Sequence, residues 1–130
     1  MKTHVIVRNG DNDENSTTER DATRQPIDNM PMHPEYPCAH CIGSSALATV
    51  AETVFGTAEI PEVAMTSSTA PGVTHRWTDL RSYADEVAQA RIWAGFHYRF
   101  STVVGQDMGR KIDQHVVKSM MQPATFADSR

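Results

Sequence analysis

The sequence predicts an all-α fold: a partial helical bundle of about three main helices, with a long polar N-terminal loop and an irregular connection between the first two helices. Three segments carry the prediction, at about 38–55, 79–94 and 102–121. Each places apolar residues at helical spacing between residues that start and stop helices. At 130 residues the chain is long enough for one modest core and no more than one domain.

The first helix is predicted from about Cys38 to Phe55. Pro37 stands where a helix can begin, and Gly56 is a natural end. The segment before it, residues 26–37, contains four prolines. Proline cannot continue a helix and restricts the residue before it, so this segment should be extended and stiff.

The second helix is predicted to begin after Thr78 as N-cap and to end before Gly95. Its apolar face consists of Leu80, Tyr83, Ala84, Val87 and Ala94. Arg91 lies in the middle of that face. A guanidinium there must be paired, because an isolated buried charge is very costly. Its partner is either an internal carboxylate or a bound oxyanion, for which the planar donor fork is well suited.

The third helix is predicted from Thr102 to Met121, with Ser101 as its cap. Its stripe consists of Gly105, Met108, Gly109, Ile112, Val116 and Met120. The two glycines, four residues apart, would let another helix approach closely, although each costs about 1 kcal/mol of helix propensity relative to alanine.

Outside the helices the sequence predicts little regular structure. Val5–Val7 has strand propensity but no visible partner, and residues 9–25 lack large apolar side chains, so they should form a solvated loop. Residues 57–77 read as loop, or at most a short strand. The expected organisation is a polar, flexible N-terminal segment (1–29), a helical domain (30–121) and a flexible tail (122–130).

Composition excludes several kinds of partner. A net charge of −4 argues against nucleic acid or an anionic membrane surface. No apolar run approaches the roughly 18 residues that would span a membrane, and the first residues do not form a signal peptide. We therefore expect a soluble protein whose compartment the sequence leaves open.

Two short segments concentrate the residues that could carry chemistry. His40 stands in the opening turn of the first helix, where free N–H groups bind anions, and His97 follows the turn at Gly95. Cys38 and Cys41 are spaced as half of a zinc site or as a redox dithiol, with His33 near them. No second Cys/His cluster follows, so two small, semi-buried thiols are the simpler interpretation.

Together, PEYPCAH (residues 34–40) and ARIWAGFH (residues 90–97) resemble the second and third signatures of the type 2 phosphatidic acid phosphatase and vanadium haloperoxidase superfamily. The second signature is Pro-Ser-Gly-His. The third is Ser-Arg, five residues, His, three residues, Asp, and here Ala90-Arg91 precedes His97 and Ser101 at that spacing. The wider run looks like the soluble, bacterial and plant-type branch, over roughly residues 30–121.

The resemblance implies a haloperoxidase-like or acid phosphatase-like protein with a pocket for vanadate or phosphate. His97 would be the vanadium ligand or the phosphate nucleophile, Arg91 would neutralise the oxyanion, and His40 would be the acid/base. The small-molecule partners it implies are peroxide with halide, or a phosphoester. One set of cationic donors suits both oxyanions because their geometry and charge are shared.

This chain departs from the family pattern at five places, one of them Ala90, where the third signature has serine. Cys38 replaces the serine that donates to the oxyanion, Ala39 replaces glycine but keeps its N–H, and Ser101 replaces the aspartate that orients the histidine. The first signature, a lysine with an Arg-Pro pair seven residues on, is absent; an alignment puts Lys2 near its arginine.

Two alternatives to an enzyme therefore stand: a truncated, non-catalytic remnant that at most binds an oxyanion, or a small metal or redox module built on Cys38 and Cys41. The partner is expected to be a missing N-terminal half or a second copy in a homo-oligomer.

Overall fold

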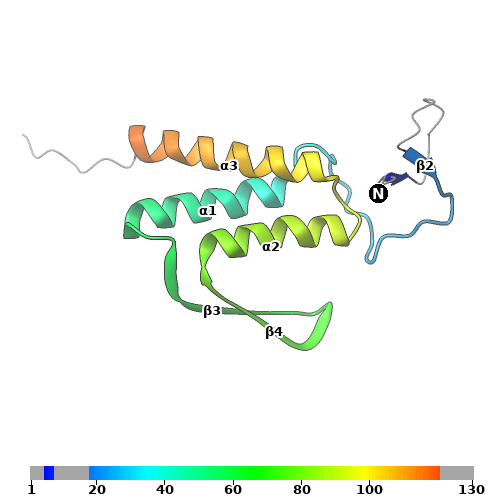
Figure 1. The fold of residues 1–130 in the computed structure, drawn as a ribbon, viewed down its shortest axis with the longest axis horizontal. Helices are drawn as coiled ribbons and strands as arrows, with labels where there is room; N and C mark the ends of the chain where they lie inside the picture. The colour runs from blue at the N-terminus through cyan, green and yellow to red at the C-terminus, as the bar shows by residue number, and fades with distance from the viewer. Residues whose placement is uncertain (1–4, 8–17, 121–130) are drawn as a thin grey trace, which may run out of the picture.

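The computed structural model describes residues 5–7 and 18–120. Three helices lie side by side, with α1 between α2 and α3, and a hairpin passes beside α2 (Figure 1). In chain order the elements are β1 (Val5–Val7), β2 (Thr18–Arg20), α1 (Ala39–Phe55), β3 (Glu59–Ser67), β4 (Ala70–Asp79), α2 (Leu80–Trp93) and α3 (Arg99–Ser119).

The predicted all-α class is wrong, because an antiparallel hairpin replaces the loop predicted between the first two helices. β3 pairs with β4, with Val63 opposite Trp77 and Met65 opposite His75. Pro61 and Pro71 favoured a loop, yet both lie where the register shifts, and there a missing N–H costs no ladder hydrogen bond. The fold is therefore mixed α/β, with three helices as predicted.

A second correction concerns the N-terminal segment. Val5–Val7 does have a partner: it pairs in parallel with β2, which lies inside the stretch predicted to be loop. The partner is a polar tripeptide, Thr18–Arg20, without the apolar pattern by which a strand is recognised.

The helix α1 begins and ends as predicted. Cys38 is its N-cap, with Sγ accepting from the Cys41 N–H, and Gly56 closes it in the left-handed conformation at φ 72°. Glycine adopts this conformation at little cost, which is why it ends helices so often.

The first residues of α2 and α3 differ from those predicted. Asp79, not Thr78, caps α2, through a 2.7 Å hydrogen bond that its carboxylate accepts from the Ser82 N–H. The helix α3 starts at Arg99, so Ser101 lies inside it and is completely buried instead of capping it.

Close packing of α1 on α3 depends on glycine, as predicted. A Cβ added at Gly105 would lie 2.6 Å from the Cys38 carbonyl oxygen, and one at Gly109 would lie 2.3 Å from that of Ile42. Only glycine fits at this separation. The N-terminal end of α1 therefore packs directly against α3.

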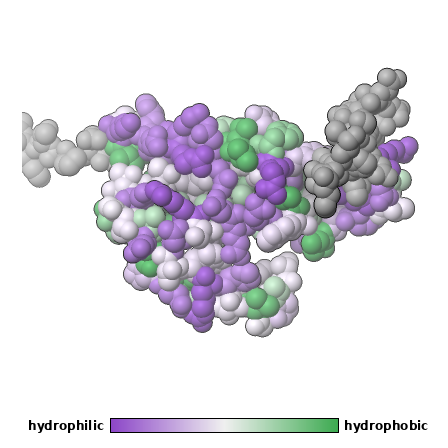
Figure 2. Space-filling view, viewed as in Figure 1, coloured by the Kyte–Doolittle hydropathy of each residue, from purple (hydrophilic) through white to green (hydrophobic). Residues whose placement is uncertain are grey.

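The buried apolar residues in the described part of the chain are all small: Cys38, Cys41, Ala48, Ala51, Ala84 and Ala88. Larger apolar side chains lie at the surface, where Figure 2 shows separate green patches among polar ones, one of them over α3. None of the described helices is both long and apolar enough to cross a membrane.

Candidate functional site

His97 is the best-buried ionisable side chain of the candidate site, and it follows directly on the turn at the end of α2. Gly95 makes that turn at φ 80°, and the N–H of His97 donates to the Arg91 carbonyl at 3.3 Å. The ring Nδ1 lies 2.6 Å from the main-chain oxygen of Glu35. A carbonyl only accepts, so Nδ1 carries the hydrogen. The opposite nitrogen, Nε2, is buried, and no group in the described part of the chain forms a hydrogen bond with it.

Arg91 lies in the last turn of α2. Two of its donors, Nε and Nη2, are also buried without a partner among the described residues. The sequence left open whether Arg91 pairs with an internal carboxylate or with a bound oxyanion. Among the described residues, no carboxylate forms an ion pair with it. Instead its Cζ lies 4.6 Å from the centroid of the Phe96 ring, and burial lowers the pKa of the guanidinium. The group therefore holds unused donors beside an aromatic face.

Two further histidines stand near His97. The ring of His33 stacks on His97 with centroids 5.7 Å apart, and it lies 6.2 Å from the ring of His40. Partial burial lowers the pKa of His40, and the charges of Arg91, His33 and His97 lower it further. The result is a cluster of Arg91 with His33, His40 and His97, on a chain whose net charge is negative.

The structure corrects the oxyanion-donor role expected of Cys38. Cys38 and Cys41 form a disulfide, so the sulfur has no hydrogen to donate. The N–H of Cys38 donates to the Ser101 carbonyl at 3.3 Å. Ala39, the first residue of α1, keeps an N–H that no group in the described chain accepts.

The two thiols expected at Cys38 and Cys41 are therefore paired with each other. In the described residues no group of three or more His, Cys, Asp or Glu side chains could hold a metal ion. Lys2, the remaining oxyanion-binding candidate, lies outside the described residues.

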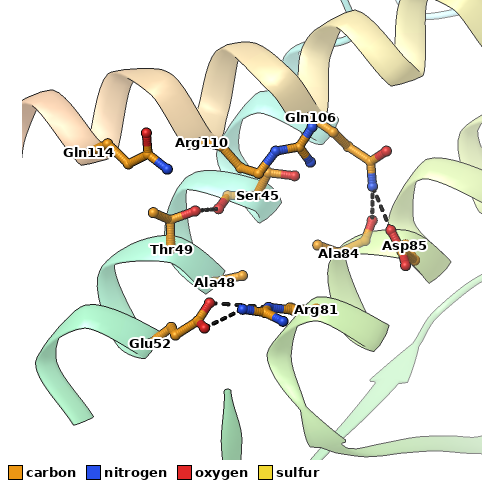
Figure 3. A pocket seen from close by; sticks show the side chains of 10 residues that line it. All are labelled: Ser45, Ala48, Thr49, Glu52, Arg81, Ala84, Asp85, Gln106, Arg110 and Gln114. Carbon is orange, nitrogen blue, oxygen red and sulfur yellow. Dashed lines mark hydrogen bonds and ion pairs between the residues drawn. The ribbon is translucent and has the colours of Figure 1, made fainter. Parts of the chain in front are cut away.

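A polar groove lies between the three helices, further along α1, with a volume of about 330 Å³ (Figure 3). Its charged groups already have partners: Arg81 pairs with Glu52, and Gln106 donates to Asp85 at 2.8 Å. Arg91 and His97 lack such partners. The unmet hydrogen-bonding capacity is thus at the histidine cluster and not in this groove.

Sequence reasoning missed the part played by Glu35. Its main-chain oxygen accepts from both His97 Nδ1 and Ser101 Oγ, the latter at 2.8 Å. The residue lies inside the PEYPCAH segment, but a pattern of side chains does not predict a contact made by the main chain. His33 was considered only as a metal ligand, and its stacking arises from the path of the proline-rich segment.

The comparisons with known proteins concern the family and the fold. A bacterial vanadium-dependent iodoperoxidase structure is similar at 29% identity and TM-score 0.65, over 75% of this chain and 24% of that one. The holo-type bacterial vanadium-dependent chloroperoxidase shares the fold at 19% identity and TM-score 0.61, over 73% and 22% of the two chains. Its apo-type counterpart matches at 20% identity and TM-score 0.56, over 65% and 20%.

The chain thus spans at most about a quarter of the length of these three structures. No curated protein sequence matches it. The family model described as the VCPO second helical-bundle domain matches residues 2–125, nearly the whole chain. The chain therefore belongs to the VCPO second helical-bundle domain family, within the type 2 phosphatidic acid phosphatase and vanadium haloperoxidase superfamily that its two motifs resemble.

Proposed function

We propose that this chain supplies the histidine and arginine side of an oxyanion site of the vanadium haloperoxidase type. The observation that carries the proposal is the set of three buried nitrogens without partners: Arg91 Nε, Arg91 Nη2 and His97 Nε2. Buried polar atoms are nearly always hydrogen-bonded, so a group of unpaired ones calls for a ligand. A tetrahedral oxyanion such as vanadate or phosphate supplies the acceptors that two guanidinium donors need.

His97 Nε2 suits a different contact from the guanidinium donors of Arg91, because it can offer a lone pair. With its hydrogen on Nδ1, the neutral ring presents a lone pair at Nε2. That lone pair can bind vanadium as a ligand or attack phosphorus, so either chemistry would use the same tautomer of His97. The residues present therefore fit vanadate: His97 as the ligand, Arg91 as the counter-charge and Ala39 as a main-chain donor.

His40 is the acid/base of the proposed site. Its lowered pKa favours the neutral ring, which can accept a proton from a substrate or water at neutral pH. Its position at the start of α1 leaves it accessible to solvent, unlike His97. When bound, vanadate would activate peroxide for halide oxidation, whereas phosphate-ester hydrolysis would need His97 as nucleophile.

A non-catalytic role remains the second candidate, and one observation favours it. The disulfide removes the side-chain donor that Cys38 would offer, so the site has fewer contacts to an oxyanion than the family pattern provides. With the chain covering at most about a quarter of its structural relatives, catalysis would draw on groups from a further polypeptide segment or a second copy.

The test begins with binding. The purified chain is titrated with vanadate, and separately with phosphate, by calorimetry and by ⁵¹V NMR. Arg91→Ala and His97→Ala should each weaken vanadate binding at least about tenfold, since each removes a buried charge-assisted or ligand contact. Arg110→Ala, in the groove of Figure 3, is the matched control and should bind as the wild type does.

Activity is then measured as bromide or iodide oxidation with peroxide, and as hydrolysis of a generic phosphomonoester. Binding that Arg91→Ala does not weaken would refute the proposal. Binding without turnover in either assay would support the non-catalytic alternative.

A further inference from the structure

We propose that Glu35 is the positioning residue for His97, fixing its tautomer and aiming Nε2 into the oxyanion site; this rests on the function proposed above. The family pattern has an aspartate for this task at the position of Ser101, and a serine carries no charge. Glu35 is far from His97 in sequence but next to it in space.

The contacts between Glu35 and the start of α3 involve both its main chain and its side chain. The main-chain oxygen accepts from His97 Nδ1 at 2.6 Å and from Ser101 Oγ at 2.8 Å. The carboxylate accepts from the Tyr98 N–H at 2.9 Å. Glu35, a residue of the proline-rich segment, thus holds three groups between the end of α2 and the first turn of α3: the His97 ring, the Tyr98 N–H and the Ser101 hydroxyl.

The main-chain contact determines which ring nitrogen carries the hydrogen. An imidazole with Nδ1 against a carbonyl oxygen must place its hydrogen there, which leaves Nε2 with a lone pair. Without that contact the ring would exchange between two tautomers, and only one of them can use Nε2 as a ligand or nucleophile. Ser101 supports the arrangement by holding the same oxygen in place.

The carboxylate acts on the backbone next to the ring. Tyr98 is the N-cap of α3 and forms no capping hydrogen bond with its own side chain. Glu35 Oε1 instead binds its N–H, and this fixes the residue that follows His97. The same oxygen lies 3.6 Å from His97 Nδ1, too far for a hydrogen bond but close enough for its charge to favour a hydrogen at Nδ1.

An ordinary loop anchor would make similar hydrogen bonds, so the test must read the ring itself. The full chain is labelled with ¹⁵N-histidine, and the His97 ring nitrogens are assigned by comparison with His97→Gln. In the wild type without oxyanion we expect a single tautomer with hydrogen on Nδ1. Glu35→Ala keeps the main-chain oxygen but frees the Tyr98 N–H and removes the charge near Nδ1. The ring should then leave that oxygen in part of the molecules, and the signal should become a mixture of tautomers.

If Glu35→Ala does not fold, Glu35→Gln replaces it in the tautomer measurement. It keeps an acceptor for the Tyr98 N–H and loses only the charge, so a smaller shift toward the mixture is expected. Glu62→Ala, which removes an exposed carboxylate of the hairpin, is the control and should leave the His97 signal unchanged. An unchanged His97 signal in the folded Glu35 variants, or a wild-type ring with its hydrogen on Nε2, would overturn the proposal.

A second arm measures vanadate affinity, which should fall roughly tenfold in Glu35→Ala because groups that orient a ligating histidine have effects of this size. If the wild type binds vanadate and Glu35→Ala binds it with the same affinity, the positioning role of Glu35 is contradicted. If the wild type binds no vanadate, the proposed function fails, while the tautomer measurement, made without vanadate, still decides the role of Glu35.

Discussion

The guanidinium of Arg91 lies over the ring of Phe96, with Cζ 4.6 Å from the ring centroid, while its Nε and Nη2 have no hydrogen-bond partner in residues 5–7 and 18–120. The aromatic face thus orients the cation without using its donors. A carboxylate in the same place would satisfy those donors and cancel the charge that an oxyanion needs.

Phe96→Leu should therefore weaken oxyanion binding without abolishing it. Removing a cation–π contact costs about 0.5–1 kcal/mol, which corresponds to roughly a two- to fivefold loss of vanadate affinity. Calorimetric titration measures this, with Phe55→Leu at the exposed end of α1 as the control. Equal affinities for the wild type and Phe96→Leu would show that the ring does not orient Arg91.

Oxyanion binding should be coupled to proton uptake by His40. In the free site, partial burial and the neighbouring cations lower its pKa, so the ring is mostly neutral near its ordinary value of about 6.5. A bound anion opposes those cations and raises the pKa, and a proton is taken up. Affinity should therefore rise as the pH falls through this window.

Sulfate is the suitable probe for this coupling, because it has no ionisation of its own between pH 5 and 8. Calorimetry in buffers of different ionisation enthalpy counts the protons taken up. His40→Gln should abolish most of the uptake, and an affinity independent of pH in the wild type would contradict the prediction.

His33→Ala should raise the pKa of His40. His33 is one of the neighbours that lower this pKa, after burial and the charge of Arg91, so its removal relieves part of the effect. An NMR titration of the His40 ring in both proteins measures the change. His115→Ala, on the exposed surface of α3, is the control, and a His40 titration that does not move in His33→Ala would refute the electrostatic link.

Gly105→Ala and Gly109→Ala should each destabilise the fold by about 1–3 kcal/mol, because the new methyl group would overlap the backbone of α1. Gly43→Ala is a matched control in α1: nothing lies within 4 Å of its added Cβ. Alanine is the better helix former, so this change should stabilise by up to about 1 kcal/mol. Urea unfolding measures all three, and similar midpoints would contradict the close contact of α1 with α3.

Much of the candidate site could be predicted from the sequence because its key residues lie in two short segments. The spacing of Arg91 and His97 follows from one helix end and one glycine turn, and His40 from the first turn of α1. The ends of α1 were predicted for the same reason, since Pro37 and Gly56 act on their immediate neighbours.

The failures involve partners that are distant in the chain. The hairpin depends on cross-strand pairs such as Val63 with Trp77, and its two prolines pointed the other way. Ser101 looked like a cap, yet its hydroxyl binds Glu35, a residue 66 positions earlier. The thiols of Cys38 and Cys41 were expected to be free, and the disulfide formed by their side chains was not foreseen.

By itself, the sequence determined the helix start before His40 and the glycine turn before His97, because backbone preferences act over a few residues. Tertiary structure alone decided that Arg91 has no carboxylate partner among the described residues and that His97 holds its hydrogen on Nδ1. Both the pairing of Arg91 and the tautomer of His97 depend on which groups the fold places next to these side chains. The protonation and pairing of a buried group are set by its neighbours in space, whatever their distance along the chain.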